Sequence, residues 1–229
     1  MVIQKFTSYL KSERRYSHHT VNAYLKDVNQ FFYFLNVLPK NIKSITATDI
    51  REWLVFLKQK NLLAKTINRK ISSLKTFFNF CEIEFSLVSN PSQKIRVLKE
   101  KKRLPTVISE RSLILLFDNK NIFPDNFNGN RDRFILDLFY QSGIRLSELI
   151  NLDLHDFDRH GRLIKILGKR NKERIIPLTD SLISTFDIYI KLRSQIDIVH
   201  TNYLFVTKSG HKTYPKMIYR IVTHYLSKF

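Results

Sequence analysis

Glycine is scarce in this chain, and its few positions are uneven. The 229 residues include 5 glycines, all in the back half: Gly129, Gly143, Gly161, Gly168 and Gly210. A glycine-free front half with helical periodicity is typical of a helical bundle, whereas glycine-punctuated sequence indicates mixed structure with turns. This contrast predicts two domains.

Cysteine and long apolar runs are also nearly absent. Cys81 is the one cysteine, so it cannot form an internal disulfide, and its surroundings, "LKTFFNFCEIEF", predict a core side chain rather than a reactive or metal-binding thiol. No run of about 18 apolar residues occurs, so no membrane-spanning helix is predicted. The start, "MVIQKFTSYLKSERR", lacks the apolar core and cleavage site of a signal peptide. We expect a reduced, cytoplasmic protein with no membrane partner.

Negative charge is the third shortage. The chain has 20 Asp and Glu against 39 Lys and Arg, a formal net charge of +19, and residues 1–105 hold +13 of it (20 basic minus 7 acidic). Hydrophobic residues make up 43% of the chain, so it can bury a core and is not a disordered polycation. A folded domain with this surplus repels itself unless a polyanion neutralises it, and the natural candidates are nucleic acid and an anionic membrane surface. The lack of a membrane-spanning run makes the membrane the weaker of the two.

The front half reads as four helices. The first covers about 2–10, and the second begins at a cap formed by Ser17 or Thr20. The third begins at Thr46 or Thr48, and the fourth, "AKTINRKISSLKTFFNFCEIEF", is long and has an apolar stripe.

The other face of the fourth helix is basic. It carries Lys65, Arg69, Lys70 and Lys75, and along the chain no acidic residue follows until Glu82. Solvated lysines on an ordinary surface helix are one interpretation. The spacing without compensating carboxylates also suits a phosphate backbone, so these four are candidate DNA-binding residues.

The segment after the fourth helix changes character. In "NPSQKIRVLKEKKRLPTVIS" two prolines and few large apolar residues predict a basic linker, 90–106, between a helical domain, 1–89, and a second domain, 107–229. A basic linker suits a protein that wraps around a duplex, so we expect it to cross the DNA backbone. Its candidate DNA-binding residues are Lys101, Lys102 and Arg103.

The second domain combines helices with a β-hairpin. "SERSLILLFDN" and "NGNRDRFILDLFYQSG" are helical, and the period then changes to two in "GRLIKILG" and "ERIIPL", with "KRNK" as the turn. "SLISTFDIYIKLRSQI" is again a helix, followed by a short strand in "NYLFVTKSG" and a last helix from about Pro215. The fold class is therefore mainly α, of the α+β type. The hairpin tip and flanks carry Lys169, Arg170, Lys172 and Arg174.

The stretch "SGIRLSELINLDLHDF" at 142–157 places an arginine directly after a predicted turn. Arg145 lies just after Gly143 at the head of an amphipathic helix, and Glu148 follows three residues later. A surface Arg–Glu pair worth a few tenths of a kcal/mol is one reading. An arginine aimed at a phosphate is the other.

The longer stretch "SGIRLSELINLDLHDFDRHGRLIKILGKRNKERIIPL" closely resembles the first half of the catalytic domain of the tyrosine recombinases, the lambda-integrase superfamily, and of the Xer recombinases above all. It has the family's Gly-hydrophobic-Arg-hydrophobic-Ser-Glu-Leu pattern, then Leu-x-x-x-Asp, then a Gly-Lys-x-x-Lys-x-Arg hairpin ending in Pro-Leu. "SHHTVNAYLKDVNQFFYFL" and "KTINRKISSLKTFFNF" resemble the helical core-binding domain. The resemblance implies a four-helix core-binding domain over 1–89 and, over 107–229, a mixed α/β catalytic domain incomplete at its C-terminus.

The resemblance also implies a chemistry. In the family a tyrosine hydroxyl attacks a DNA phosphodiester to give a 3′-phosphotyrosine and a free 5′-hydroxyl, with no metal and no nucleotide cofactor. Arg145 falls on the first active-site arginine, whose rigid guanidinium can bond two oxygens of the transition state. Lys169 falls on the hairpin lysine, which can protonate the leaving 5′-oxygen, and Arg170 and Lys172 become candidate DNA contacts. The implied partners are double-stranded DNA and recombinase protomers in a homo- or hetero-tetramer.

The second half of the family's active site has no match. None of the seven histidines is followed three residues later by arginine, and Tyr214, Tyr219 and Tyr225 precede the place of the nucleophile. We expect these tyrosines to be core or surface aromatics and the chain to be a recombinase cut short. A site-specific recombinase acting on chromosome dimers or mobile elements, a non-catalytic protein that occupies recombination sites, and a generic basic binder remain the alternatives.

Overall fold

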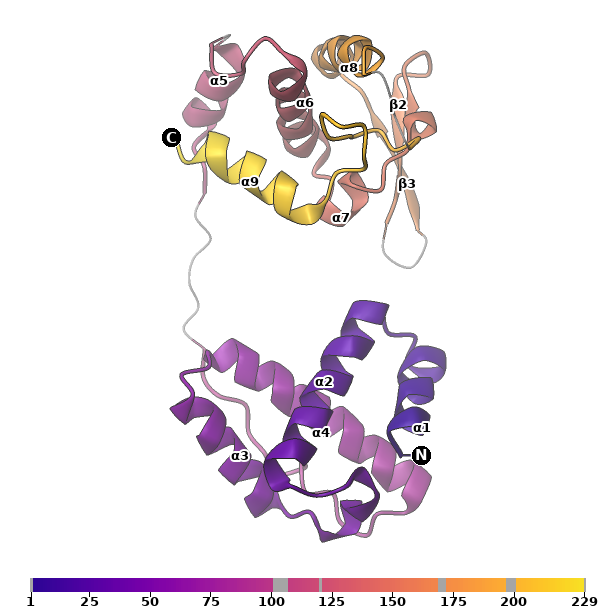
Figure 1. The fold of residues 1–229 in the computed structure, drawn as a ribbon, viewed down its shortest axis with the longest axis vertical. Helices are drawn as coiled ribbons and strands as arrows, with labels where there is room; N and C mark the ends of the chain where they lie inside the picture. The colour runs from indigo at the N-terminus through magenta and orange to yellow at the C-terminus, as the bar shows by residue number, and fades with distance from the viewer. Residues whose placement is uncertain (1, 101–106, 120, 169–171, 197–200, 229) are drawn as a thin grey trace. The chain divides into compact units, whose positions relative to one another are not determined.

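The computed structural model describes residues 2–100, 107–119, 121–168, 172–196 and 201–228. The chain divides into two compact units, Met1–Leu104 and Pro105–Phe229 (Figure 1). Each unit has its own hydrophobic core.

The first unit is a helical bundle, as expected. Its helices are α1 (Val2–Ser8) with a π-helical continuation η1 (Tyr9–Glu13), α2 (His18–Leu35), η2 (Pro39–Ser44), α3 (Ala47–Gln59) and α4 (Ala64–Phe85). Of the alternative caps, Ser17 begins α2 and Thr46 begins α3, where Thr46 and Asp49 form a capping box. Each side-chain oxygen satisfies a backbone N–H that the helix itself leaves unpaired.

Aromatic side chains fill the core of this bundle. Phe31 packs edge-on against Trp53 with ring centroids 5.2 Å apart, and Phe77 lies between Phe6 and Phe32 in the same manner. Cys81 is fully buried, and burial raises the pKa of its thiol to about 12. The prediction of a core cysteine is confirmed.

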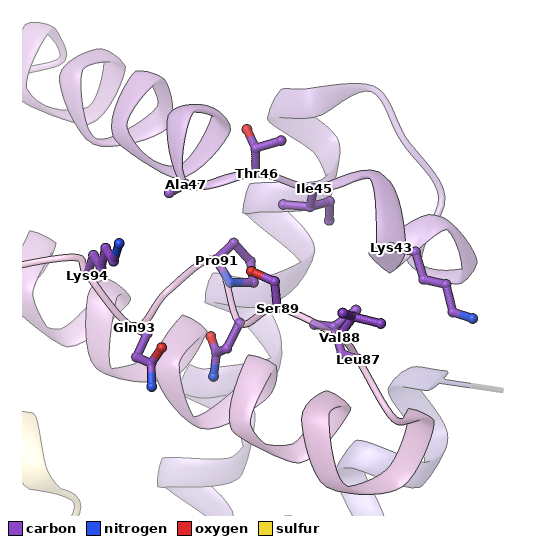
Figure 2. A pocket seen from close by; sticks show the side chains of 11 residues that line it. Lys43, Ile45, Thr46, Ala47, Leu87, Val88, Ser89, Pro91, Gln93 and Lys94 are labelled. Carbon is purple, nitrogen blue, oxygen red and sulfur yellow. The ribbon is translucent and has the colours of Figure 1, made fainter.

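The segment that follows α4 stays on the bundle. It runs beside the loop that precedes α3, and a hollow of about 480 Å³ lies between them, with Lys43 and Lys94 at opposite ends (Figure 2). Asn90 is buried and bonds Asn79 and Glu82 of α4 through its side-chain nitrogen. The turn after α4 is therefore fixed to that helix.

Asn68 on α4 holds the next part of the same segment. Its amide accepts from the backbone N–H of Leu98 at 2.7 Å and donates to the backbone carbonyl of Leu98 at 2.9 Å and to Glu100 at 2.7 Å. The linker expected over 90–106 thus begins with a stretch that is attached to the bundle. Its remaining residues, 101–106, lie outside the described residues.

The second unit packs helices around a small sheet. Its helices are α5 (Glu110–Asp118), α6 (Phe127–Ser142), α7 (Leu146–Leu149), η3 (Leu154–Asp156), α8 (Asp180–Arg193) and α9 (Pro215–Leu226). Its strands are β1 (Phe157–Asp158), β2 (Leu163–Leu167) and β3 (Glu173–Pro177), antiparallel in the order β1-β2-β3. The α+β class and the hairpin are confirmed.

Two details of this unit bear on the predicted elements. Ile164 and Ile166 of β2 are buried while their neighbours are not, as alternation of period two requires. The short strand expected in "NYLFVTKSG" is reduced to two isolated bridges, Asp153 with Tyr203 and Val206 with Lys212. None of the described helices is long and apolar enough to cross a membrane.

Candidate active site and nucleic-acid interface

Gly143 ends α6 and determines where Arg145 lies. It closes α6 with a left-handed backbone (φ 58°) and donates its N–H to the carbonyl of Phe139 at 3.1 Å. Ile144 is buried, and Arg145 is already the N-cap residue of α7. A residue with a β-carbon disfavours this φ, so glycine lets one packed helix follow another with three residues between them. The arginine is held by helices on both sides.

Glu148 connects Arg145 to the sheet. One carboxylate oxygen accepts from the Arg145 guanidinium at 2.7 Å and the other from the Arg145 backbone N–H at 2.9 Å. Arg174 on β3 donates to both oxygens, at 3.0 and 2.8 Å. The Glu148 side chain is 5% exposed and that of Arg145 is 68% exposed. A buried carboxylate therefore orients an arginine whose guanidinium is presented to solvent.

The charge of Glu148 is strongly stabilised. The hydrogen bonds from Arg174, with those from the backbone and side chain of Arg145, lower its pKa from 4.5 to about 2 against the opposing effect of burial. The same pairing raises the pKa of Arg174. At neutral pH two cations share one anion, which leaves an excess positive charge where a phosphate could bind.

Gly168 brings the hairpin close to this cluster. A β-carbon there would lie 3.1 Å from the Lys172 carbonyl oxygen and 3.4 Å from Glu148 Oε1. Its own N–H donates to the Lys172 carbonyl at 2.7 Å and closes the hairpin. Lys172 is exposed at the root of the turn. Lys169 and Arg170, the proposed general acid and its neighbour, lie outside the described residues.

Arg174 is the member of the site that sequence reasoning left without a role. The sequence placed Arg174 beside the hairpin turn and gave it no partner. It lies 26 positions after Glu148, so the pairing is not visible in a local pattern. Two signals could have found it: the final arginine of the hairpin motif, and the alternation of β3, which puts Arg174 and Ile176 on the same face of the strand.

The basic face of α4 is divided in two. Lys65 is exposed and Lys75 is half-buried, and neither has an ion-pair partner among the described residues. Arg69 and Lys70 both bind Asp27 of α2, and Lys70 is buried. Along α4 no compensating carboxylate precedes Glu82, but Asp27 of α2 supplies one to Arg69 and Lys70, which a pattern read along a single helix does not show. Lys70 is the one of the four that lies in the interior, since Lys65 and Arg69 are exposed and Lys75 is half-buried.

The remaining candidates are the basic residues of the linker and the tyrosines near the C-terminus. Lys101, Lys102 and Arg103 lie outside the described residues. Tyr225 is in the core against Phe123, and burial raises the pKa of its hydroxyl. Tyr214 and Tyr219 are exposed. In the described parts of the chain no cluster of three or more metal-ligating side chains occurs.

Comparison with known proteins identifies this arrangement. The model of the phage integrase family matches residues 107–228, and that of the phage integrase N-terminal SAM-like domain matches residues 3–84. The chain belongs to the phage integrase family of tyrosine recombinases. The resemblance seen in the motifs is thereby confirmed for both units.

Individual relatives agree with this membership. The chain is 37% identical to the tyrosine recombinase XerC of Staphylococcus carnosus, over 90% of its own length and 69% of the relative. It is also 37% identical to a tyrosine recombinase of Pseudothermotoga lettingae, over 98% of its length and 76% of the relative. The Tn1549 transposon integrase in complex with transposon right end DNA has the same fold, with a TM-score of 0.76 at 19% identity, covering 100% of this chain and 79% of that one.

Proposed function

We propose that this chain acts in site-specific recombination by binding duplex DNA through both units and presenting Arg145 to a phosphate. The observation that carries the proposal is the Arg145–Glu148–Arg174 cluster in a chain of the tyrosine recombinase family. A guanidinium oriented by a buried carboxylate needs little reorganisation to bond two phosphate oxygens. The net charge of +19 supplies the long-range attraction.

In this proposal the chemistry is that of the family. A tyrosine hydroxyl attacks the phosphorus, the bond to the 5′-oxygen breaks, and Lys169 gives its proton to that oxygen. Arg145 stabilises the charge on the non-bridging oxygens. No metal or nucleotide cofactor takes part. Further recombinase protomers would complete the assembly on DNA, and the cytoplasm is the compartment in which such DNA is found.

A second candidate, a non-catalytic protein that occupies recombination sites, is favoured by the state of the tyrosines. Tyr225, on the last described helix, is buried against Phe123, so its hydroxyl is not presented to a DNA phosphate. The two candidates share DNA binding and differ in whether a covalent intermediate forms.

DNA binding is tested by titrating a labelled duplex with the chain at several salt concentrations. We expect affinity to fall steeply with salt because bound cations release counterions from DNA. Arg145→Ala should weaken binding more than Lys191→Ala, which removes the same charge from an exposed position on α8. Affinity that hardly changes with salt would contradict the proposed function.

The two candidates are separated by a suicide substrate nicked beside the cleavage site. The absence of a protein–DNA adduct on a denaturing gel would assign the chain to the second candidate. An adduct that disappears on Tyr214→Phe or Tyr219→Phe would instead establish catalysis and identify its nucleophile.

A further inference from the structure

A buried ionic cluster joins α2 to α4 in the helical unit. At its centre is Asp27, whose side chain is 1% exposed. Lys70 donates to Asp27 Oδ1 at 2.9 Å, while Ser73 donates to Oδ2 at 2.8 Å and Arg69 binds the same oxygen. Such a carboxylate is tolerated in the interior because several donors satisfy it together.

Lys70 belongs wholly to the interior. Its ammonium binds Asp27 and Gln30 and lies 5.7 Å from the centre of the Trp53 ring. With 6% of its side chain exposed, it cannot reach a ligand without breaking these contacts. Its charge compensates Asp27 rather than serving the surface.

Arg69 has a different position in the same cluster. One of its terminal nitrogens binds Asp27, yet 42% of its side chain is exposed. Lys65 lies one turn earlier on α4 and is also exposed. A free arginine loses about 2 kcal/mol of rotamer entropy when a phosphate immobilises it. An arginine that Asp27 already holds has lost part of that freedom on folding.

We infer that Asp27 is a positioning residue for DNA binding, which holds the guanidinium of Arg69 in the orientation that receives a backbone phosphate. The inference rests on the proposed function and deepens it. Lys70 acts through Asp27 and makes no contact with DNA. If Asp27 instead competed with DNA for Arg69, removing Asp27 would strengthen DNA binding. Whether the affinity of a variant without Asp27 falls or rises therefore distinguishes positioning from competition.

The test uses the full chain and a double variant. Asp27→Leu with Lys70→Met replaces the buried pair by apolar side chains of similar size, a change that folded proteins commonly tolerate. It leaves the net charge at +19, because one negative and one positive charge are lost together. Lys70→Met alone keeps the Asp27–Arg69 contact and is the matched control. A cooperative thermal transition above the assay temperature establishes that each variant is folded under the conditions of the binding measurement.

The readout is affinity for a labelled mixed-sequence duplex at several salt concentrations. The control should bind within about twofold of the unchanged chain, as expected for the loss of a charge that does not touch DNA. The double variant should bind about tenfold more weakly, with a slope of log affinity against log salt reduced by about 1, the loss of one charge-assisted phosphate contact. Adding Arg69→Gln to the Lys70→Met control should lower its DNA affinity by about tenfold, the loss expected for the double variant. Adding Arg69→Gln to the double variant should lower its affinity no further.

Arg69→Lys keeps the test decisive if the double variant does not fold. It changes no charge and removes no buried group, but an ammonium cannot hold Asp27 and a phosphate in the same planar geometry. We expect it to bind DNA as weakly as Arg69→Gln. Unchanged affinity of Arg69→Lys, tighter binding by the double variant, or a loss in Lys70→Met equal to that of Arg69→Gln would each overturn the inference. Salt-independent binding by the unchanged chain would instead overturn the proposed function.

Discussion

Glu148 carries the charge on which both Arg145 and Arg174 depend, so Glu148→Gln removes the centre of the candidate active site. The pKa of this carboxyl is lowered from 4.5 to about 2. Because one unit of pKa corresponds to about 1.4 kcal/mol, the ionised carboxylate stabilises the folded state by about 3 kcal/mol. Glutamine retains the shape and one acceptor oxygen, but it leaves two guanidinium groups close together without an anion.

The pH dependence has a definite sign. The folded protein binds a proton on Glu148 less readily than the unfolded chain does, since its folded pKa is the lower one. The stabilisation is therefore complete above about pH 4.5 and is lost as the pH falls towards about 2. The difference in stability between the unchanged chain and Glu148→Gln should shrink over that window.

Thermal unfolding followed by circular dichroism measures both effects. Near neutral pH the second unit of Glu148→Gln should melt about 10 °C lower than that of the unchanged chain. Glu173→Gln is the control, because its carboxylate lies on the same hairpin and pairs with Lys165 at 2.9 Å in an exposed position. It should shift stability by less than about 1 kcal/mol. Equal melting of the two variants, or a difference that grows on acidification, would refute the reasoning.

Three further outcomes are expected. Reversing Lys65 and Lys75 to glutamate should lower duplex affinity and reduce its salt dependence without lowering the melting temperature, since neither has an ion-pair partner among the described residues; unchanged affinity with a lower melting temperature would show a structural role. Asn68→Ala should free the segment that it binds and speed tryptic cleavage after Lys99, with cleavage at the unchanged rate contradicting the anchor. Gly168→Ala should cost about 1 kcal/mol of stability in the second unit, because its new methyl would crowd a backbone carbonyl 3.1 Å away; an unaltered melting curve would argue against that close approach.

Local patterns account for most of the fold that the sequence predicted. Helices with side-chain caps, such as those beginning at Ser17 and Thr46, depend on residues within one turn of each other. The same holds for Gly143, whose left-handed turn between two helices is a property of a few consecutive residues. Arg145 could therefore be placed at a helix start from sequence alone.

Contacts between distant segments account for what the sequence did not predict. Asp27 is 42 residues from Arg69, and nothing near either residue shows that α2 and α4 bring them together. The pairing of Glu148 with Arg174 likewise depends on how the hairpin packs against α7. Charge patterns read along one helix thus placed Lys70 on a basic face, although the structure buries it against Asp27.

The attachment of Leu98 and Glu100 to Asn68 has a consequence for how two DNA-binding units on one chain cooperate. Once one unit is bound, the local concentration of the other at the DNA is set by the length of chain between their points of attachment, and it falls as that length exceeds the span between the two sites. Fixing the start of the connection to α4 removes residues from this length. One asparagine on the bundle thereby favours simultaneous binding by both units, although it need not touch DNA itself.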